Sequence, residues 1–201
     1  MPLYVGSNKI KELGDYGVYY GSTPIEKIYN GSQLVYEWKP YNPNTVFYNN
    51  GNVGAVTWSA SLHKGIYSLS LAGGGNAANN GYYYWPAGNK GSVLVCTFKL
   101  AQKSTISVTL GAGGAAYGGK GGNTVFSING TTAITCPGGG GAITINSSVI
   151  NILSTTTNNT GGGGGGSGSN PTTLSPWGDG GYTYSAAGRG GGMRLEWLRL
   201  K

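Results

Sequence analysis

The fold class follows from one stretch of the chain, Thr124-Val125-Phe126-Ser127-Ile128-Asn129-Gly130-Thr131-Thr132-Ala133-Ile134-Thr135. Two runs rich in β-branched residues flank Asn-Gly, a pair that suits tight hairpin turns because both central positions take positive φ angles. The stretch therefore predicts a hairpin with strands at 124–128 and 131–135. A glycine tract, residues 138–141, follows almost directly.

The same alternation of strand and glycine tract runs through the chain beyond residue 44. Further strands are predicted at 66–71, 92–100, 105–110, 143–153 and 193–200. The other glycine tracts are residues 73–75, 111–122, 161–168 and 188–192. Such tracts are either flexible linkers or extended threefold helices of the polyproline-II type, whose outward N–H and C=O groups bond to neighbouring helices. A compact domain rarely carries five long structureless loops, which favours ordered packing.

Composition excludes several protein classes. Glycine makes up 40 of the 201 residues, yet no Gly-X-Y period runs through the chain, which excludes collagen. Gly, Asn, Thr and Ser are weak helix formers, which argues against a helical bundle. With 15 Tyr, 5 Trp and 3 Phe the chain has more aromatic residues than a disordered protein. We therefore predict a mostly β protein, in which a short N-terminal β-repeat or hairpin module precedes a glycine-rich β-sandwich-like domain with polyglycine-II-type segments.

Charge marks a boundary near residue 40. Residues 1–39 have equal numbers of acids and lysines, so the rest of the chain carries the whole net charge of +7. Pro40 and Pro43 predict a linker at 40–44, between an N-terminal attachment and oligomerisation module and a glycine-rich β domain at 45–201. A hairpin is predicted from strands 25–29 and 32–37 around Asn30-Gly31.

The N-terminal module is too small to bury much apolar surface alone. Its apolar residues therefore need a partner surface, either a second copy, with a homotrimer expected, or another protein. The residues assigned to assembly are Ile10, Leu13, Ile25, Ile28, Leu34, Val35 and Tyr36.

Aromatic residues beside asparagine give candidate receptor-binding loops, because exposed Tyr and Trp suit both sugar stacking and protein contacts. The candidates are Asn79, Asn80, Tyr82, Tyr83, Tyr84, Trp85, Trp177, Tyr182 and Tyr184. An alternative stays open, in which these rings cover the bare backbone of the glycine tracts. Residues 154–160, rich in Asn and Thr, form a third candidate for which a solvated loop is favoured.

Residue types give little support for catalysis, and we predict neither enzymatic activity nor a cofactor. His63 is the only histidine, and the two cysteines lack metal-ligand spacing, so no metal site is expected. Asp179 and Glu196 are the only acids after residue 39, which is a poor basis for a glycosidase pair. A triad through His63 is not excluded by the sequence, although a surface turn residue is the favoured interpretation.

The cysteines, the basic residues and the apolar stretches of the chain bear on disulfides, nucleic-acid binding and membrane insertion. Cys96 and Cys136 are interpreted as buried free thiols, with a disulfide as the alternative. The basic residues are scattered, which argues against a nucleic-acid site. No apolar stretch approaches the roughly 20 residues of a membrane helix, and the N-terminus lacks the apolar core of a signal peptide. We therefore expect synthesis in a cytoplasm and no membrane insertion.

Two parts of the chain resemble phage proteins. Residues 3–12 (LYVGSNKIKE), 20–29 (YGSTPIEKIY) and 31–37 (GSQLVYE) resemble the N-terminal module of phage and prophage minor structural proteins. Residues 65–75 (GIYSLSLAGGG), with similar stretches at 107–114 and 190–197, look like the glycine-rich domain of phage tail-fibre and tip adhesin proteins.

The resemblance implies a virion component assembled in the host cytoplasm. Its N-terminal module would join other virion proteins, and its glycine-rich domain, as a tail-fibre tip or a head fibre, would bind a bacterial surface glycan or outer protein for host attachment. The first alternative is a purely structural role as a capsid decoration or fibre joint. The second is a polysaccharide depolymerase.

Overall fold

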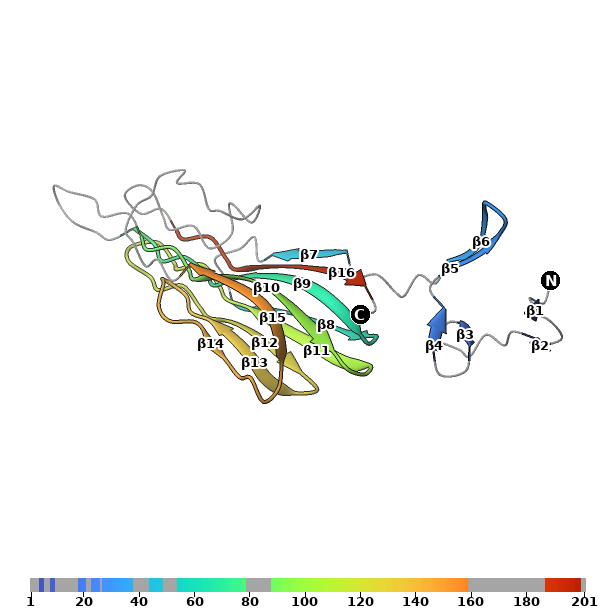
Figure 1. Cartoon of the computed structure of the whole chain (residues 1–201). Coiled ribbons are helices and arrows are strands. Elements are labelled where there is room, and N and C mark those ends of the chain that lie inside the picture. The colour runs from blue at the N-terminus through green and yellow to red at the C-terminus, as the bar shows by residue number, and fades with distance from the viewer. Residues whose placement is uncertain are drawn as a thin grey trace. The chain divides into compact units, whose positions relative to one another are not determined.

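The computed structural model describes residues 4–5, 8–9, 18–20, 23–25, 27–37, 44–48, 54–78, 88–158 and 187–199 (Figure 1). Contacts within the chain divide it into two compact units, Met1–Asn42 and Pro43–Lys201. Strands, turns and irregular segments make up the described residues, which contain no helix. The prediction of a mostly β protein is confirmed. These residues accordingly include no helix that is long and apolar enough to cross a membrane.

The described residues of the first unit form three small antiparallel sheets of two strands each. Their strands are β1 (Tyr4–Val5) with β2 (Asn8–Lys9), β3 (Val18–Tyr20) with β4 (Thr23–Ile25), and β5 (Lys27–Asn30) with β6 (Gln33–Glu37). The predicted hairpin is β5–β6, but its turn lies one residue later than expected. Asn30 pairs with Gln33, so Gly31 and Ser32 form the turn, and Gly31 takes the positive φ of 61°.

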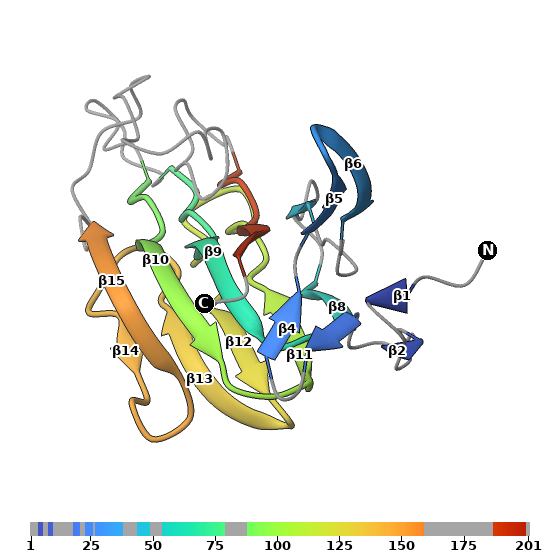
Figure 2. The ribbon, with the colours of Figure 1, turned by 45° about the vertical axis from the view of Figure 1, so that its right-hand side comes forward.

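The second unit is built from two five-stranded antiparallel sheets (Figures 1 and 2). One sheet has the order β15-β10-β9-β16-β7, and the other has the order β14-β13-β12-β11-β8. The strands of the first are β7 (Thr45–Tyr48), β9 (Gly65–Ala72), β10 (Val93–Leu100), β15 (Asn151–Asn158) and β16 (Gly192–Arg199). Those of the second are β8 (Val56–Leu62), β11 (Ser104–Leu110), β12 (Thr124–Ile128), β13 (Thr131–Cys136) and β14 (Thr144–Ile145).

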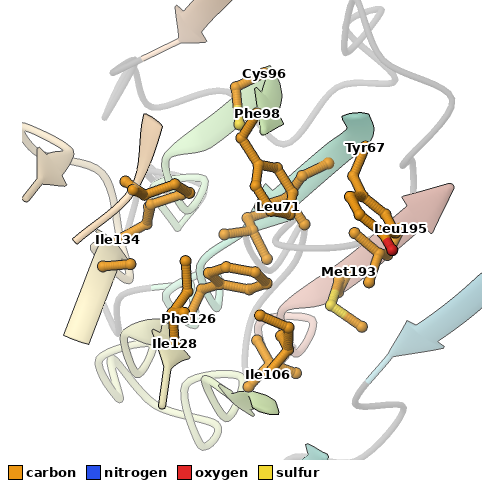
Figure 3. Close-up of a cluster of buried hydrophobic side chains, with 14 of the residues drawn as sticks. Tyr67, Leu71, Cys96, Phe98, Ile106, Phe126, Ile128, Ile134, Met193 and Leu195 are labelled. Atoms are coloured by element: carbon orange, nitrogen blue, oxygen red, sulfur yellow. The ribbon is translucent and has the colours of Figure 1, made fainter. Parts of the chain in front are cut away.

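A large hydrophobic core lies between the two sheets (Figure 3). Alternate residues of β11 and β12 are buried in it, as the period of two of a strand requires. Tyr67 of β9 stacks on Phe98 of β10 with ring centroids 5.5 Å apart, and Phe126 of β12 meets Phe98 edge-on at 5.8 Å. The buried Tyr67 hydroxyl donates a hydrogen bond of 2.7 Å to the carbonyl oxygen of His63. These contacts join three strands from both sheets.

The hairpin of residues 124–135 is confirmed as β12–β13. Asn129 and Gly130 form its two-residue turn with φ angles of 50° and 79°, as the Asn-Gly pair predicts. The register shifts between Phe126 and Ser127, which places Ile134 opposite Phe126 and Thr132 opposite Ser127. This bulge was not predicted, because no glycine or other sequence signal in residues 124–128 or 131–135 indicates which residue is left unpaired.

Two sequence expectations are wrong. The single strand predicted at 143–153 is broken, because a turn whose Asn146 side chain accepts hydrogen bonds from Ser148 separates β14 from β15. Residues 151–158 then pair with β10, so most of the loop expected at 154–160 is strand β15, up to residue 158. The third candidate loop is therefore largely a sheet edge. Strands β7 and β8 were not predicted.

Candidate binding site

The glycine-rich segments form a continuous layer at one end of the two sheets (Figure 1). We call it the tract layer and define it by residues 73–78, 88–92, 111–123, 137–141 and 187–191. Each segment leaves or enters a strand at the same end: 73–78 follows β9, and 111–123 joins β11 to β12. The main chains of these segments are bonded to one another without β-ladder pairing.

The central segment, residues 73–77, donates its five N–H groups to three neighbours in strict rotation. In order along the segment, the acceptors are the carbonyl oxygens of Ser92 at 3.0 Å, Gly122 at 2.9 Å, Arg189 at 2.8 Å, Asn89 at 2.8 Å and Gly119 at 2.9 Å. The central segment also accepts hydrogen bonds: Gly139, in a fourth segment, donates to Gly74 O, and Gly114, in segment 111–123, donates to Gly75 O. Every third residue thus faces the same neighbour, which differs from the period of two of a strand.

Glycine is required in this layer for close approach of main chains. A Cβ built on Gly74 would overlap the carbonyl oxygen of Ala112, and one on Gly188 would overlap that of Gly75. Neither residue has a positive φ angle. The missing side chain, and not a left-handed backbone, is therefore what these positions need.

Four polar side chains complete the hydrogen bonding of the layer. Buried Thr124 donates its hydroxyl to Ala72 O at 2.7 Å and accepts the N–H of Gly111 at 3.0 Å. The other three bonds run from Ser92 Oγ to Gly141 O at 2.7 Å, from Gly121 N to Asn76 Oδ1 at 2.8 Å, and from Gly138 N to Asn123 Oδ1 at 3.1 Å. Side chains thus satisfy main-chain groups that the neighbouring segments do not reach.

The turn of residues 115–118 presents an exposed aromatic ring at this end. Tyr117 is 62% exposed and adopts φ of 67°, and Gly118 follows with φ of 87°. The N–H of Gly119 donates to the carbonyl oxygen of Ala115 at 3.0 Å and closes the turn. A left-handed tyrosine is uncommon and costs about 1–2 kcal/mol, and such conformations cluster at functional sites. Sequence reasoning missed Tyr117, because it stands alone within a glycine tract.

All nine residues predicted to bind a receptor lie outside the described residues. They are Asn79, Asn80, Tyr82, Tyr83, Tyr84, Trp85, Trp177, Tyr182 and Tyr184. The described residues beside them are nevertheless close together. Ala77, two residues before the first loop, donates to Gly119 O, and Gly188, shortly after the second, donates to Gly114 O. Both acceptors lie next to the Tyr117 turn, so the structure brings ends of both loops to one place.

All charged side chains among the described residues of the tract layer are positive. Lys90, Lys120 and Arg189 lie in it, and none of its described residues is acidic. Arg189 and Lys120 are exposed. A positive field at this end favours the approach of anionic or strongly polar ligands.

The residues considered for catalysis are dispersed. Glu196, on β16, forms an ion pair with Arg194, with 3.0 Å between Oε1 and the Arg194 Nε, while Asp179 lies outside the described residues. His63 lies partly buried between β8 and β9. Across the part of the chain that the structure describes, no three His, Cys, Asp or Glu residues are grouped as metal ligands would be.

The two cysteines are buried free thiols in the core, in strands β10 and β13. Burial raises the pKa of Cys96 to about 12. Burial also raises the pKa of Cys136 to about 12, with a smaller contribution from Cys96 and an opposing one from a backbone hydrogen bond at Leu94. Both thiols are therefore protonated at neutral pH and are poor nucleophiles.

The chain was also compared with protein-family models, with curated proteins and with solved structures, and it matches none of them.

Proposed function

We propose that this protein is a non-enzymatic phage virion fibre protein, a tail-fibre tip or a head fibre, that binds a bacterial surface glycan or outer protein. The observation that carries the proposal is the convergence at one end of the tract layer. The exposed Tyr117 ring and the ends of both aromatic-rich loops lie there on a hydrogen-bonded scaffold. Binding residues are commonly presented by loops on such rigid supports.

The scaffold itself is proposed to be a glycine-rich β-sandwich-like domain whose tracts run as polyglycine-II-type helices. The rotation of hydrogen bonds from residues 73–77 among three neighbours supports this, because a threefold extended helix repeats its direction every third residue. The overlap that a Cβ would make at Gly74 supports it too. Packed in this way, the tracts hold the loop ends firmly without a side-chain core.

Residues 1–39 are proposed to be a β-repeat module that attaches the protein to other virion proteins and associates as a homotrimer. Ile25 and Ile28 are half-buried and Leu34 is 43% exposed in the first unit, so apolar surface is available for burial. Val35 and Tyr36 lie in β6, whereas Ile10 and Leu13 are outside the described residues.

Binding by labelled full-length protein to a panel of bacterial strains and to an array of bacterial capsules, O-antigens and teichoic acids tests the receptor proposal. We expect replacement of Tyr82–Trp85 by serine, and separately Tyr117→Asn, to weaken binding at least tenfold. Asparagine tolerates the positive φ at residue 117, so the second variant removes the ring without straining the turn. Tyr29→Ser, at a tyrosine 54% exposed in the β5–β6 hairpin, is the matched control.

A purely structural virion role is the second candidate, and the charge-free sheet that ends in β8 favours it, since such a surface suits contact between subunits. Unchanged binding by both aromatic variants, together with loss of their incorporation into particles, would replace the receptor proposal with this one. Release of oligosaccharides from any bound polysaccharide would instead identify a depolymerase.

A further inference from the structure

Among the described strands, β8 forms a long edge of its sheet. It pairs with β11 along all seven of its residues, from Val56 to Leu62, without a register shift. Among the described strands, none lies on its other side. Natural sheets protect such edges with charges, prolines, bulges or very short strands, because unpaired N–H and C=O groups recruit another strand. β8, with the sequence VTWSASL, has none of these protections.

The sheet behind this edge is free of charge. Strands β8, β11, β12, β13 and β14 contain no Asp, Glu, Lys, Arg or His, although the chain carries a net charge of +7. The opposing sheet, by contrast, includes Lys99, Arg194 and Glu196. A second copy of this sheet can therefore pair at its edge without setting like charges of the paired strands against each other.

The inner face of β8 is only partly covered. Val56, Trp58 and Ala60 pack against the core but stay half-exposed, whereas Leu62 at the end of the strand is buried. The outer face carries the exposed hydroxyl residues Thr57, Ser59 and Ser61. An added strand in register would cover the apolar face and extend the hydroxyl face.

We propose that β8 pairs antiparallel with β8 of a second copy of this chain, about a twofold axis at Ser59, and joins two five-stranded sheets into one of ten. This register uses all seven residues and places the large Trp58 opposite the small Ala60, Thr57 opposite Ser61, and Val56 opposite Leu62. A twofold contact requires such self-complementarity.

Other registers fit less well. A shift of two residues toward Val56 pairs only five residues and sets Trp58 against its own copy. A shift of one residue turns the apolar side chains to the hydroxyl face. The pairing involves residues 56–62 alone, so it holds whether or not residues 1–39 form a trimer and whether or not the loops bind a receptor.

Cysteine cross-linking of the full chain tests the register. In Ser59→Cys the two introduced thiols face each other, within the Cα separation of a disulfide, so mild oxidation should yield covalent dimers for most of the protein. In Thr57→Cys the two thiols lie four residues apart, about 13 Å, and the protein should stay monomeric on a non-reducing gel. Native Cys96 and Cys136 are buried and give no background. Absence of dimers from Ser59→Cys, or equal cross-linking of Thr57→Cys, would overturn the proposal.

Sedimentation equilibrium gives an independent readout with a charge placed at the axis. Ser59→Lys sets two ammonium groups together, and the mass of the assembly should fall to half that of the wild-type assembly. The matched control is Thr155→Lys, at an exposed position on β15, an edge strand of the opposing sheet, and it should keep the wild-type mass. Both substitutions are at exposed sites, and an unchanged Tm shows that the fold is intact. A wild-type mass for Ser59→Lys would reject β8 as the interface.

Discussion

At the scale of single residues, the tract layer depends on glycines, because they have no side chain. Gly74 lies against the carbonyl oxygen of Ala112 and donates to that of Gly122. Since its neighbours are main chain, they cannot move aside as a flexible side chain would. The layer is therefore more sensitive to one added methyl group than an ordinary hydrophobic core, where small overpacking costs about 1–3 kcal/mol.

Replacement of Gly74 by alanine should lower the free energy of unfolding by more than about 3 kcal/mol, because the methyl group must displace the Ala112 segment and weaken the Gly122 bond. Urea denaturation measures this. Gly130→Ala is the control, since nothing lies within 4 Å of its Cβ and only the positive φ of 79° opposes it, at about 1 kcal/mol. Equal costs for the two variants would contradict close packing of the tracts.

Stability should fall above pH 9. The pKa of Cys96 and Cys136 is raised from 9.0 to about 12 in the folded protein. Below pH 9 both states keep the protons, but between pH 9 and 12 the unfolded chain loses protons that the folded chain retains. Over this range each thiol lowers the free energy of unfolding by about 1.4 kcal/mol per pH unit.

Urea denaturation between pH 8 and 10 detects this loss, and the variant with both cysteines replaced by alanine should show a flatter profile. Burial raises the pKa of Tyr67 above its ordinary 10.0 as well, so that residue contributes only at the upper end of the range. An identical pH profile for the double variant would mean that the thiols are not the groups responsible.

At the scale of elements, the strands were more predictable than their connections. Runs of β-branched residues located β9 to β13 and β16 within a residue or two, because the period of two and the turn residues both mark them. β7 and β8 were missed, since Asn and Gly surround them and Ser and Ala interrupt the apolar pattern of β8. The break between β14 and β15 was missed because the Asn146 turn lies within a continuous run of strand-forming residues.

The candidate site could be predicted only in part. Clusters of aromatic residues drew attention to the two loops, but Tyr117 gives no such signal, and its exposure and left-handed backbone depend on how the tract folds back at residues 115–118. Nor could the sequence show that ends of both loops meet near Gly119 and Gly114. That proximity results from main-chain bonds between segments far apart in the chain.

Amide hydrogen exchange distinguishes ordered tracts from linkers. The N–H groups of Gly74, Gly75, Gly114 and Gly188 are bonded and their residues are buried, so they should exchange as slowly as those of the central strand β9. NMR-detected exchange in D2O resolves them individually. Free glycine linkers would lose their protons within seconds, and such exchange at Gly74 and Gly75 would remove the scaffold on which the receptor proposal rests.

At the scale of the whole molecule, all of the buried core residues that the structure describes belong to the second unit. Removal of residues 1–42 should therefore leave a folded protein whose Tm differs from that of the full chain by no more than about 2 °C. Calorimetry measures this, and the near-ultraviolet signal of the packed aromatic residues reports tertiary structure. A molten or aggregated product would show that the first unit contributes to the fold of the second.

The hydrogen bonds of the tract layer join main-chain groups of the layer itself, so they do not depend on the side chains of residues outside it. The sequence between Ala78 and Gly88, and the sequence that precedes residue 187, can therefore change in length and composition without altering the bonds that anchor their described ends. A randomised library inserted between Ala78 and Gly88 should yield a high proportion of folded members. In evolution, the same arrangement would allow rapid exchange of recognition loops while the anchoring layer stays constant.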